Sequence, residues 1–179
     1  MKSFWTVVLV TALAVTGMLM APTVAVAEDS LWAKLTPLQE VPVCSSIGSG
    51  NFKAEISDNQ TAVDYELTYV LEGTVTQGHI HLGQIFASGG ISVWLCQTAG
   101  NTDPAGLAPP CPPSGTVTGT FTKANVVGPT PQGIAGGPGG ASDGDFAELL
   151  RALRHGLTYA NVHSNICPGG EVRGQIWKK

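Results

Sequence analysis

The sequence predicts an all-β protein, an antiparallel Greek-key sandwich or barrel with one short amphipathic helix. Three observations predict this class: apolar residues alternate along most of the chain, glycine and proline are abundant, and only one segment has helical periodicity. The 179 residues include 23 glycines and 12 prolines, which favour many turns and therefore short strands. Hydrophobic residues make up 43% and charged residues 12%, a composition that excludes a disordered polyampholyte. A net charge of −4 excludes the basic face typical of nucleic-acid binders.

The strands are predicted from alternation of apolar and polar residues. Phe52, Ala54 and Ile56 alternate with polar residues, and the same pattern returns at 63–69 after a turn. These two runs indicate an antiparallel hairpin with one solvent-facing side. Further strands are expected at 33–36, 74–82, 91–96, 115–122, 158–163 and 171–177. Seven or eight short strands separated by turn residues are typical of a sandwich or a Greek-key barrel.

One helix is expected over residues 145–155. From Phe146 onwards, apolar residues occur at i, i+3, i+4 and i+7, which places them on one helical face that packs on the sheets. Asp145 and Glu148 resemble a capping pair at its start, and Gly156 supplies a left-handed stop.

Residues 1–27 have the features of a secretory signal peptide. Lys2 gives a positive start, residues 4–20 are mostly apolar, and the Ala-Val-Ala sequence at 25–27 is a cleavage pattern. A retained membrane anchor is the alternative, but the cleavage pattern and the acidic residues that follow it favour removal. We therefore expect residues 28–179 to form one domain, secreted or periplasmic, with no membrane span after cleavage.

Four cysteines follow the predicted signal peptide, and an even number in an oxidising compartment favours two disulfides. Three pairings can be drawn. A Cys96–Cys111 bridge would tie off the Gly- and Pro-rich segment 101–110, which leaves Cys44 to pair with Cys167. A thiolate metal site is the alternative, but no two cysteines have the CxxC spacing that places two sulfurs on one ion.

Three histidines are the candidates for chemistry: His79, His81 and His163. Residues i and i+2 of a strand point to the same face, so the first two imidazoles project together. His163 ends the strand expected at 158–163, and if that strand lies beside the first, the three imidazoles converge. Such a site would suit Zn²⁺ or copper, with a fourth position left for water or another ligand. The alternative is that all three are ordinary polar residues at a sheet rim.

No other constellation predicts an activity. The chain has no GxSxG motif, and its serines have no partner base fixed by the sequence. Glu40, Glu171 and Arg173 are expected to form an ion pair between strand ends rather than an acid/base pair. We therefore expect no enzymatic activity.

Four segments in order carry a resemblance to a known family. They are LTPLQEVP at 35–42, GHIHLG at 78–83, NVHS at 161–164 and PGGEVRGQI at 168–176. This ordered set resembles the motifs of the CHRD domain, the module named after chordin. The resemblance implies an extracellular β-rich domain, found singly in exported microbial proteins and in tandem in chordin, a secreted antagonist of bone morphogenetic proteins. It implies no established biochemical activity. The four cysteines and the long segments 96–111 and 136–144 depart from the usual pattern.

A looser similarity links the chain to Cu/Zn superoxide dismutase, a β-sandwich whose copper ligands also include an HxH pair on a strand. The dinuclear centre of that enzyme needs more histidines than this chain offers, because the remaining one, His155, lies in the predicted helix. The similarity therefore supports a mononuclear site at most and argues against dismutase activity.

Two functions of different class follow from the sequence. The first is an exported, non-enzymatic binding or structural module that acts on an extracellular or envelope protein. The alternative is a mononuclear copper- or zinc-binding protein that uses His79, His81 and His163. Copper or zinc is the only cofactor that the sequence suggests, and with unperturbed imidazoles its affinity should fall around pH 6–7.

Overall fold

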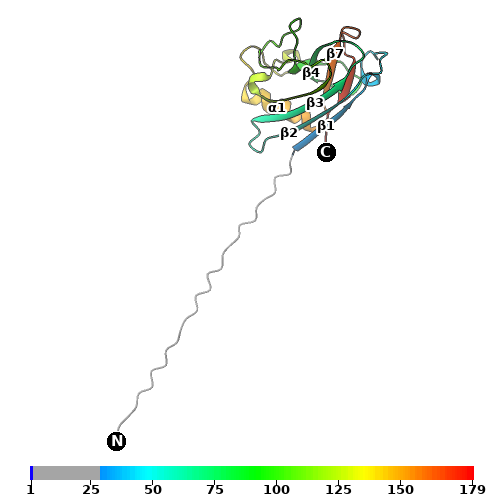
Figure 1. The fold of residues 1–179 in the computed structure, drawn as a ribbon. Coiled ribbons are helices and arrows are strands. Elements are labelled where there is room, and N and C mark those ends of the chain that lie inside the picture. The colour runs from blue at the N-terminus through cyan, green and yellow to red at the C-terminus, as the bar shows by residue number, and fades with distance from the viewer. Residues whose placement is uncertain (2–28) are drawn as a thin grey trace.

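The computed structural model describes Met1 and residues 29–179, so the predicted signal peptide lies, apart from Met1, outside the described residues. Two antiparallel sheets pack against each other as the layers of a sandwich (Figure 1). One sheet has the strand order β6-β3-β2-β1-β9 and the other β5-β4-β7-β8. The strands are β1 (Asp29–Leu35), β2 (Ser49–Ile56), β3 (Ala62–Val70), β4 (Val75–Leu82), β5 (Gly90–Cys96), β6 (Gly115–Thr122), β7 (Thr158–Ser164), β8 (Val172–Gln175) and β9 (Trp177–Lys178).

The predicted all-β class is confirmed, and of the two predicted architectures the sandwich is the one observed. The hairpin of β2 and β3 has Phe52 opposite Leu67 and Ala54 opposite Tyr65, and all four face the core. Along β2 every second residue is buried, as the alternation predicts. In the part of the chain that the structure describes, no helix is sufficiently long and apolar to cross a membrane.

The predicted strand at 171–177 is wrong in one respect, because the chain changes sheets within it. β8 pairs with β7 in one sheet, and β9 pairs with β1 in the other. Ile176, which is fully buried, lies at the crossing point between them. Both halves are extended, so the sequence pattern gives no sign of where the partner strand changes.

The helix α1 (Asp143–Arg154) begins two residues earlier than predicted. Its N-cap is Ser142, whose Oγ accepts a hydrogen bond from the backbone N–H of Asp145 at 3.1 Å. The predicted capping pair of Asp145 and Glu148 is therefore wrong, since a serine three residues upstream supplies the acceptor. The predicted apolar face is buried in the core, and Gly156 has the left-handed conformation expected after the helix (φ +68°).

Both predicted disulfides are present: Cys44–Cys167 and Cys96–Cys111. The loop closed by the second bridge is organised by the buried carboxylate of Asp103, which accepts hydrogen bonds from three backbone N–H groups at 2.9–3.0 Å. The first bridge joins the loop before β2 to the loop between β7 and β8. That second loop lies against His163, through the carbonyl oxygen of Pro168.

Candidate metal site

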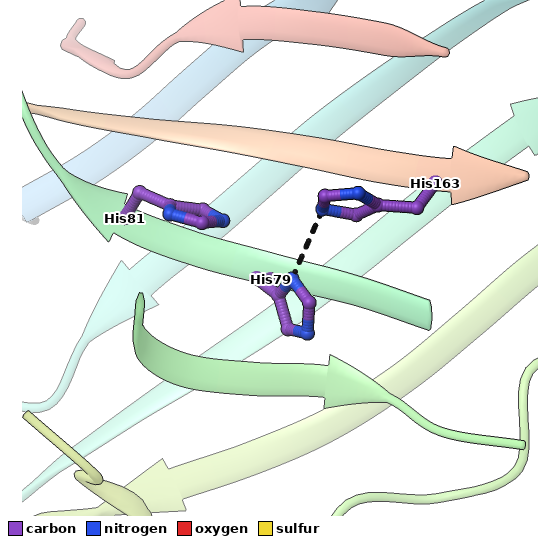
Figure 2. A group of neighbouring side chains, drawn as sticks. All are labelled: His79, His81 and His163. Carbon is purple, nitrogen blue, oxygen red and sulfur yellow. Dashed lines mark hydrogen bonds between the residues drawn. The ribbon is translucent and has the colours of Figure 1, made fainter. Parts of the chain in front are cut away.

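The three histidines lie on two neighbouring strands of the four-stranded sheet. β4 carries His79 and His81, and β7, paired with it, carries His163 opposite Gln77. Ile80 of β4 and Val162 of β7 belong to the core, so the imidazoles project from the opposite face of the sheet. The structure thus brings together all three residues that the sequence singled out (Figure 2).

The imidazoles form a compact cluster. The ring centroid of His79 lies 5.4 Å from that of His81 and 5.0 Å from that of His163. The centroids of His81 and His163 are 6.2 Å apart. One nitrogen from each ring lies within 4.8 Å of the other two. Two nitrogens bound tetrahedrally to one ion at about 2.1 Å lie about 3.4 Å apart, so binding would require the most widely separated rings to approach each other by about an ångström.

The cluster is buried rather than at an open rim. His79 is 0% exposed, His81 8% and His163 7%. Loops cover it: the carbonyl oxygen of Gly89 lies 2.9 Å from Nδ1 of His81, and that of Pro168 lies 2.8 Å from Nδ1 of His163. A carbonyl only accepts, so both Nδ1 atoms carry the proton and both Nε2 atoms present a lone pair. This is how a backbone carbonyl orients an imidazole for a metal ion.

Burial also keeps the three rings neutral. It lowers the pKa of His79 to about 2 and that of His81 to about 4, and it lowers the pKa of His163 as well. For His79 the neighbouring histidines add to the shift, because a second positive charge so close is unfavourable. The neutral imidazole is the form that binds metal ions, and this cluster therefore offers it throughout the physiological pH range.

The model of the CHRD domain matches residues 31–176, which include most of β1, all of β2 through β8 and the three histidines. The chain belongs to the CHRD domain family. No curated protein and no solved structure matches the chain significantly.

Aromatic residues of the CHRD domain pack directly on the imidazoles. The ring of Tyr159 is stacked on that of His81 with centroids 4.8 Å apart, and the rings of Trp94 and His79 pack edge to face with centroids 4.3 Å apart. The guanidinium of Arg173 lies 3.4 Å from the centre of the Tyr159 ring, a cation–π contact. These rings fix the orientation of the imidazoles.

The predicted ion pair among Glu40, Glu171 and Arg173 is wrong. Glu171 accepts hydrogen bonds from the Oγ of Ser46 at 2.7 Å and from the backbone N–H of Glu72 at 2.6 Å. Arg173 donates instead to two backbone carbonyls of the loop before β5, at 3.1 and 2.9 Å. Backbone groups from distant loops, which the sequence does not place, satisfy these charges.

Glu40 follows the short 3₁₀ helix η1 (Pro37–Gln39) and is almost completely buried, at 4% exposure. Its Oε1 has no hydrogen-bond partner. Burial raises the pKa of this carboxyl to about 7, although the positive charge of Arg173 and the side-chain amide of Asn161 act in the opposite direction. The side chain of Asn161 also contacts the cluster, with its Oδ1 3.1 Å from Nε2 of His163.

Three further residues of this site were not predicted from the sequence: Asn161, Tyr159 and Trp94. For the first two a signal existed, because they alternate with His163 along β7 and must share its face. Trp94 comes from β5, and only the register of β5 against β4 places it opposite His79.

Gly170 is required beside the site. Its φ is +133°, and a Cβ atom there would lie 2.3 Å from Oε1 of the buried Glu40. We expect Gly170→Ala to lower the free energy of unfolding by about 1–3 kcal/mol, measured by urea denaturation. Gly169→Ala is the matched control, because nothing lies within 4 Å of its Cβ position, and should change stability by less than about 0.5 kcal/mol. Equal stability of both variants would contradict the close approach.

Proposed function

We propose that this CHRD domain is a non-enzymatic, exported binding module whose central site holds one copper or zinc ion between His79, His81 and His163. The observation that carries the proposal is the convergence of three buried imidazoles, two of them held by backbone carbonyls with Nε2 free of its proton. Neutral, oriented imidazoles are the preferred protein ligands of both ions.

The proposed binding atom of His79 is Nδ1. This nitrogen lies 3.2 Å from Nε2 of His163, and the two point toward each other in Figure 2. Because Nε2 of His163 has no proton, Nδ1 of His79 donates to it while no ion is bound. Binding would require His79 to carry its proton on Nε2 instead, a tautomer change that leaves the ring neutral.

Two features favour binding over catalysis. The cluster is almost closed to solvent, whereas catalytic metal sites keep a position open for substrate. The two disulfides are consistent with an oxidising, extracellular compartment, where the module would act on an extracellular or envelope protein.

Calorimetry with Zn²⁺ and Cu²⁺ on protein without a histidine tag tests the proposal. We expect the wild type to bind one ion, and His81→Ala to lose more than about 100-fold in affinity, because loss of a ligand should exceed the 10–100-fold effect of a supporting residue. The matched control is His155→Ala, since His155 is exposed and lies outside the cluster. Equal, weak heats for wild type and His81→Ala would contradict the proposal.

A further inference from the structure

Asn161 occupies the centre of the cluster's face. It lies directly opposite His79 in the β4–β7 register and two residues before His163 on the same strand. Its side chain is 2% exposed, and its Oδ1 is 3.1 Å from Nε2 of His163.

The contact between Oδ1 of Asn161 and Nε2 of His163 has no hydrogen-bond donor. Nδ1 of His163 carries a proton because it faces the Pro168 carbonyl, so Nε2 presents a lone pair. Oδ1 of Asn161 presents lone pairs as well, and two acceptors 3.1 Å apart repel each other. A second proton on His163 would remove the conflict, but it would place a positive charge on a ring that is only 7% exposed and packs beside two other imidazoles.

The structure presents Oδ1 of the Asn161 amide, rather than Nδ2, to Nε2 of His163. A flipped amide would instead place Nδ2 there and donate a hydrogen bond to the lone pair of Nε2. This is the competing arrangement.

Three atoms with unshared lone pairs lie close together in this cluster, which is the arrangement that a metal ion requires. Nε2 of His81 is buried without a hydrogen-bond partner, Nε2 of His163 has no proton, and Oδ1 of Asn161 faces the latter. Building on the proposed function, we propose that Oδ1 of Asn161 is the fourth ligand.

The fourth ligand has a consequence for metal choice. Three nitrogens and one oxygen complete the four-coordinate set of Zn²⁺, and a carbonyl oxygen is a hard donor. Cu⁺ prefers soft ligands and gains little from such an oxygen. The CHRD domain should therefore select a divalent ion, Zn²⁺ or Cu²⁺, over Cu⁺.

Competition titrations with Zn²⁺ and with Cu⁺ test this inference on wild type, Asn161→Ala and Asn161→Asp. We expect Asn161→Ala to lower Zn²⁺ affinity about 10–100-fold, less than the loss of an imidazole, because water can replace a neutral oxygen as the fourth ligand. Cu⁺ affinity should fall less than about threefold. Asn161→Asp should retain Zn²⁺ affinity within about tenfold, because its carboxylate keeps an oxygen ligand. Asn51→Ala is the control, an exposed asparagine on the other sheet, and should leave both affinities unchanged.

The outcomes separate the inference from the proposed function. If Asn161→Ala binds Zn²⁺ as wild type does while His81→Ala does not, Asn161 is not a ligand and the three-histidine site stands. If the wild type binds no ion, the proposed function itself fails. Loss of Zn²⁺ affinity in Asn161→Asp would instead support the flipped amide, in which an N–H group is needed, and would overturn the inference.

A spectroscopic measurement covers the case in which Asn161→Ala does not fold. Co²⁺ reports the ligand set through its visible absorption, so the bands of the Co²⁺-loaded wild type should shift in Asn161→Asp, where a carboxylate replaces the amide oxygen. Identical spectra would overturn the assignment of Asn161 as a ligand.

Discussion

The affinity of the wild-type domain for Zn²⁺ is expected to change by less than about tenfold between about pH 7.5 and pH 5.5. Protons and metal ions compete for the same imidazole lone pairs, so affinity falls only where the folded rings begin to protonate. Burial lowers the pKa of His79 to about 2 and of His81 to about 4, and it lowers that of His163. The loss around pH 6–7 that unperturbed rings would show is therefore displaced to lower pH.

Imidazoles with unperturbed pKa values would give a much steeper loss of Zn²⁺ affinity with falling pH. Three imidazoles with the ordinary pKa of about 6.5 would lose roughly 1000-fold in combined affinity over this range. Calorimetry at successive pH values, with circular dichroism to confirm the fold, distinguishes the two. The nearby Glu40 gains a proton in the same range, since its pKa is about 7, whereas Arg173 stays charged. Glu40→Gln removes that contribution, and a steep loss that persists in this variant would contradict the burial of the rings.

Removal of the Cys44–Cys167 bridge is expected to have the largest effect on stability. The two cysteines are 123 residues apart, and in the chain-entropy model a cross-link over this length contributes about 5 kcal/mol. The double variant Cys44→Ala/Cys167→Ala should also bind Zn²⁺ more weakly, because Pro168 follows Cys167 and its carbonyl orients His163. A 10–100-fold loss, roughly that of other supporting residues, is expected.

The second bridge provides the matched control. Cys96 and Cys111 are 15 residues apart, so Cys96→Ala/Cys111→Ala should lose about 3 kcal/mol. Neither cysteine hydrogen-bonds to the three imidazoles, and Zn²⁺ affinity should remain close to that of wild type. Urea denaturation and Zn²⁺ titration of both double variants measure the two effects. An equal change in Zn²⁺ affinity for both would contradict a specific role for the bridge beside Pro168.

The three histidines could be predicted from the sequence because side chains alternate between the two faces of a strand. Alternation along β4 places His79 and His81 on one face, and the pairing of β4 with β7 adds His163. The same alternation identifies the buried face of β2 and β3, and helical spacing identifies the buried face of α1. These features depend on neighbours along the chain, which the sequence displays directly.

The loops that complete the site could not be predicted in this way. Gly89 and Pro168 contribute backbone carbonyls, which every residue type has, so no pattern distinguishes them. Glu40 reaches the site from the loop after β1, and Arg173 finds backbone acceptors rather than the expected acid. The sheet change at Ile176 likewise depends on contacts between segments far apart in the chain.

The central claim is that His79, His81 and His163 hold one metal ion in the folded domain, and native mass spectrometry of protein without a histidine tag tests it most directly. After incubation with Zn²⁺ near neutral pH and removal of excess ion, the wild type should retain one zinc per chain. The triple variant His79→Ala/His81→Ala/His163→Ala should retain none, while His155→Ala behaves as wild type. A wild-type mass without zinc, or the same zinc content in the triple variant, would contradict the claim.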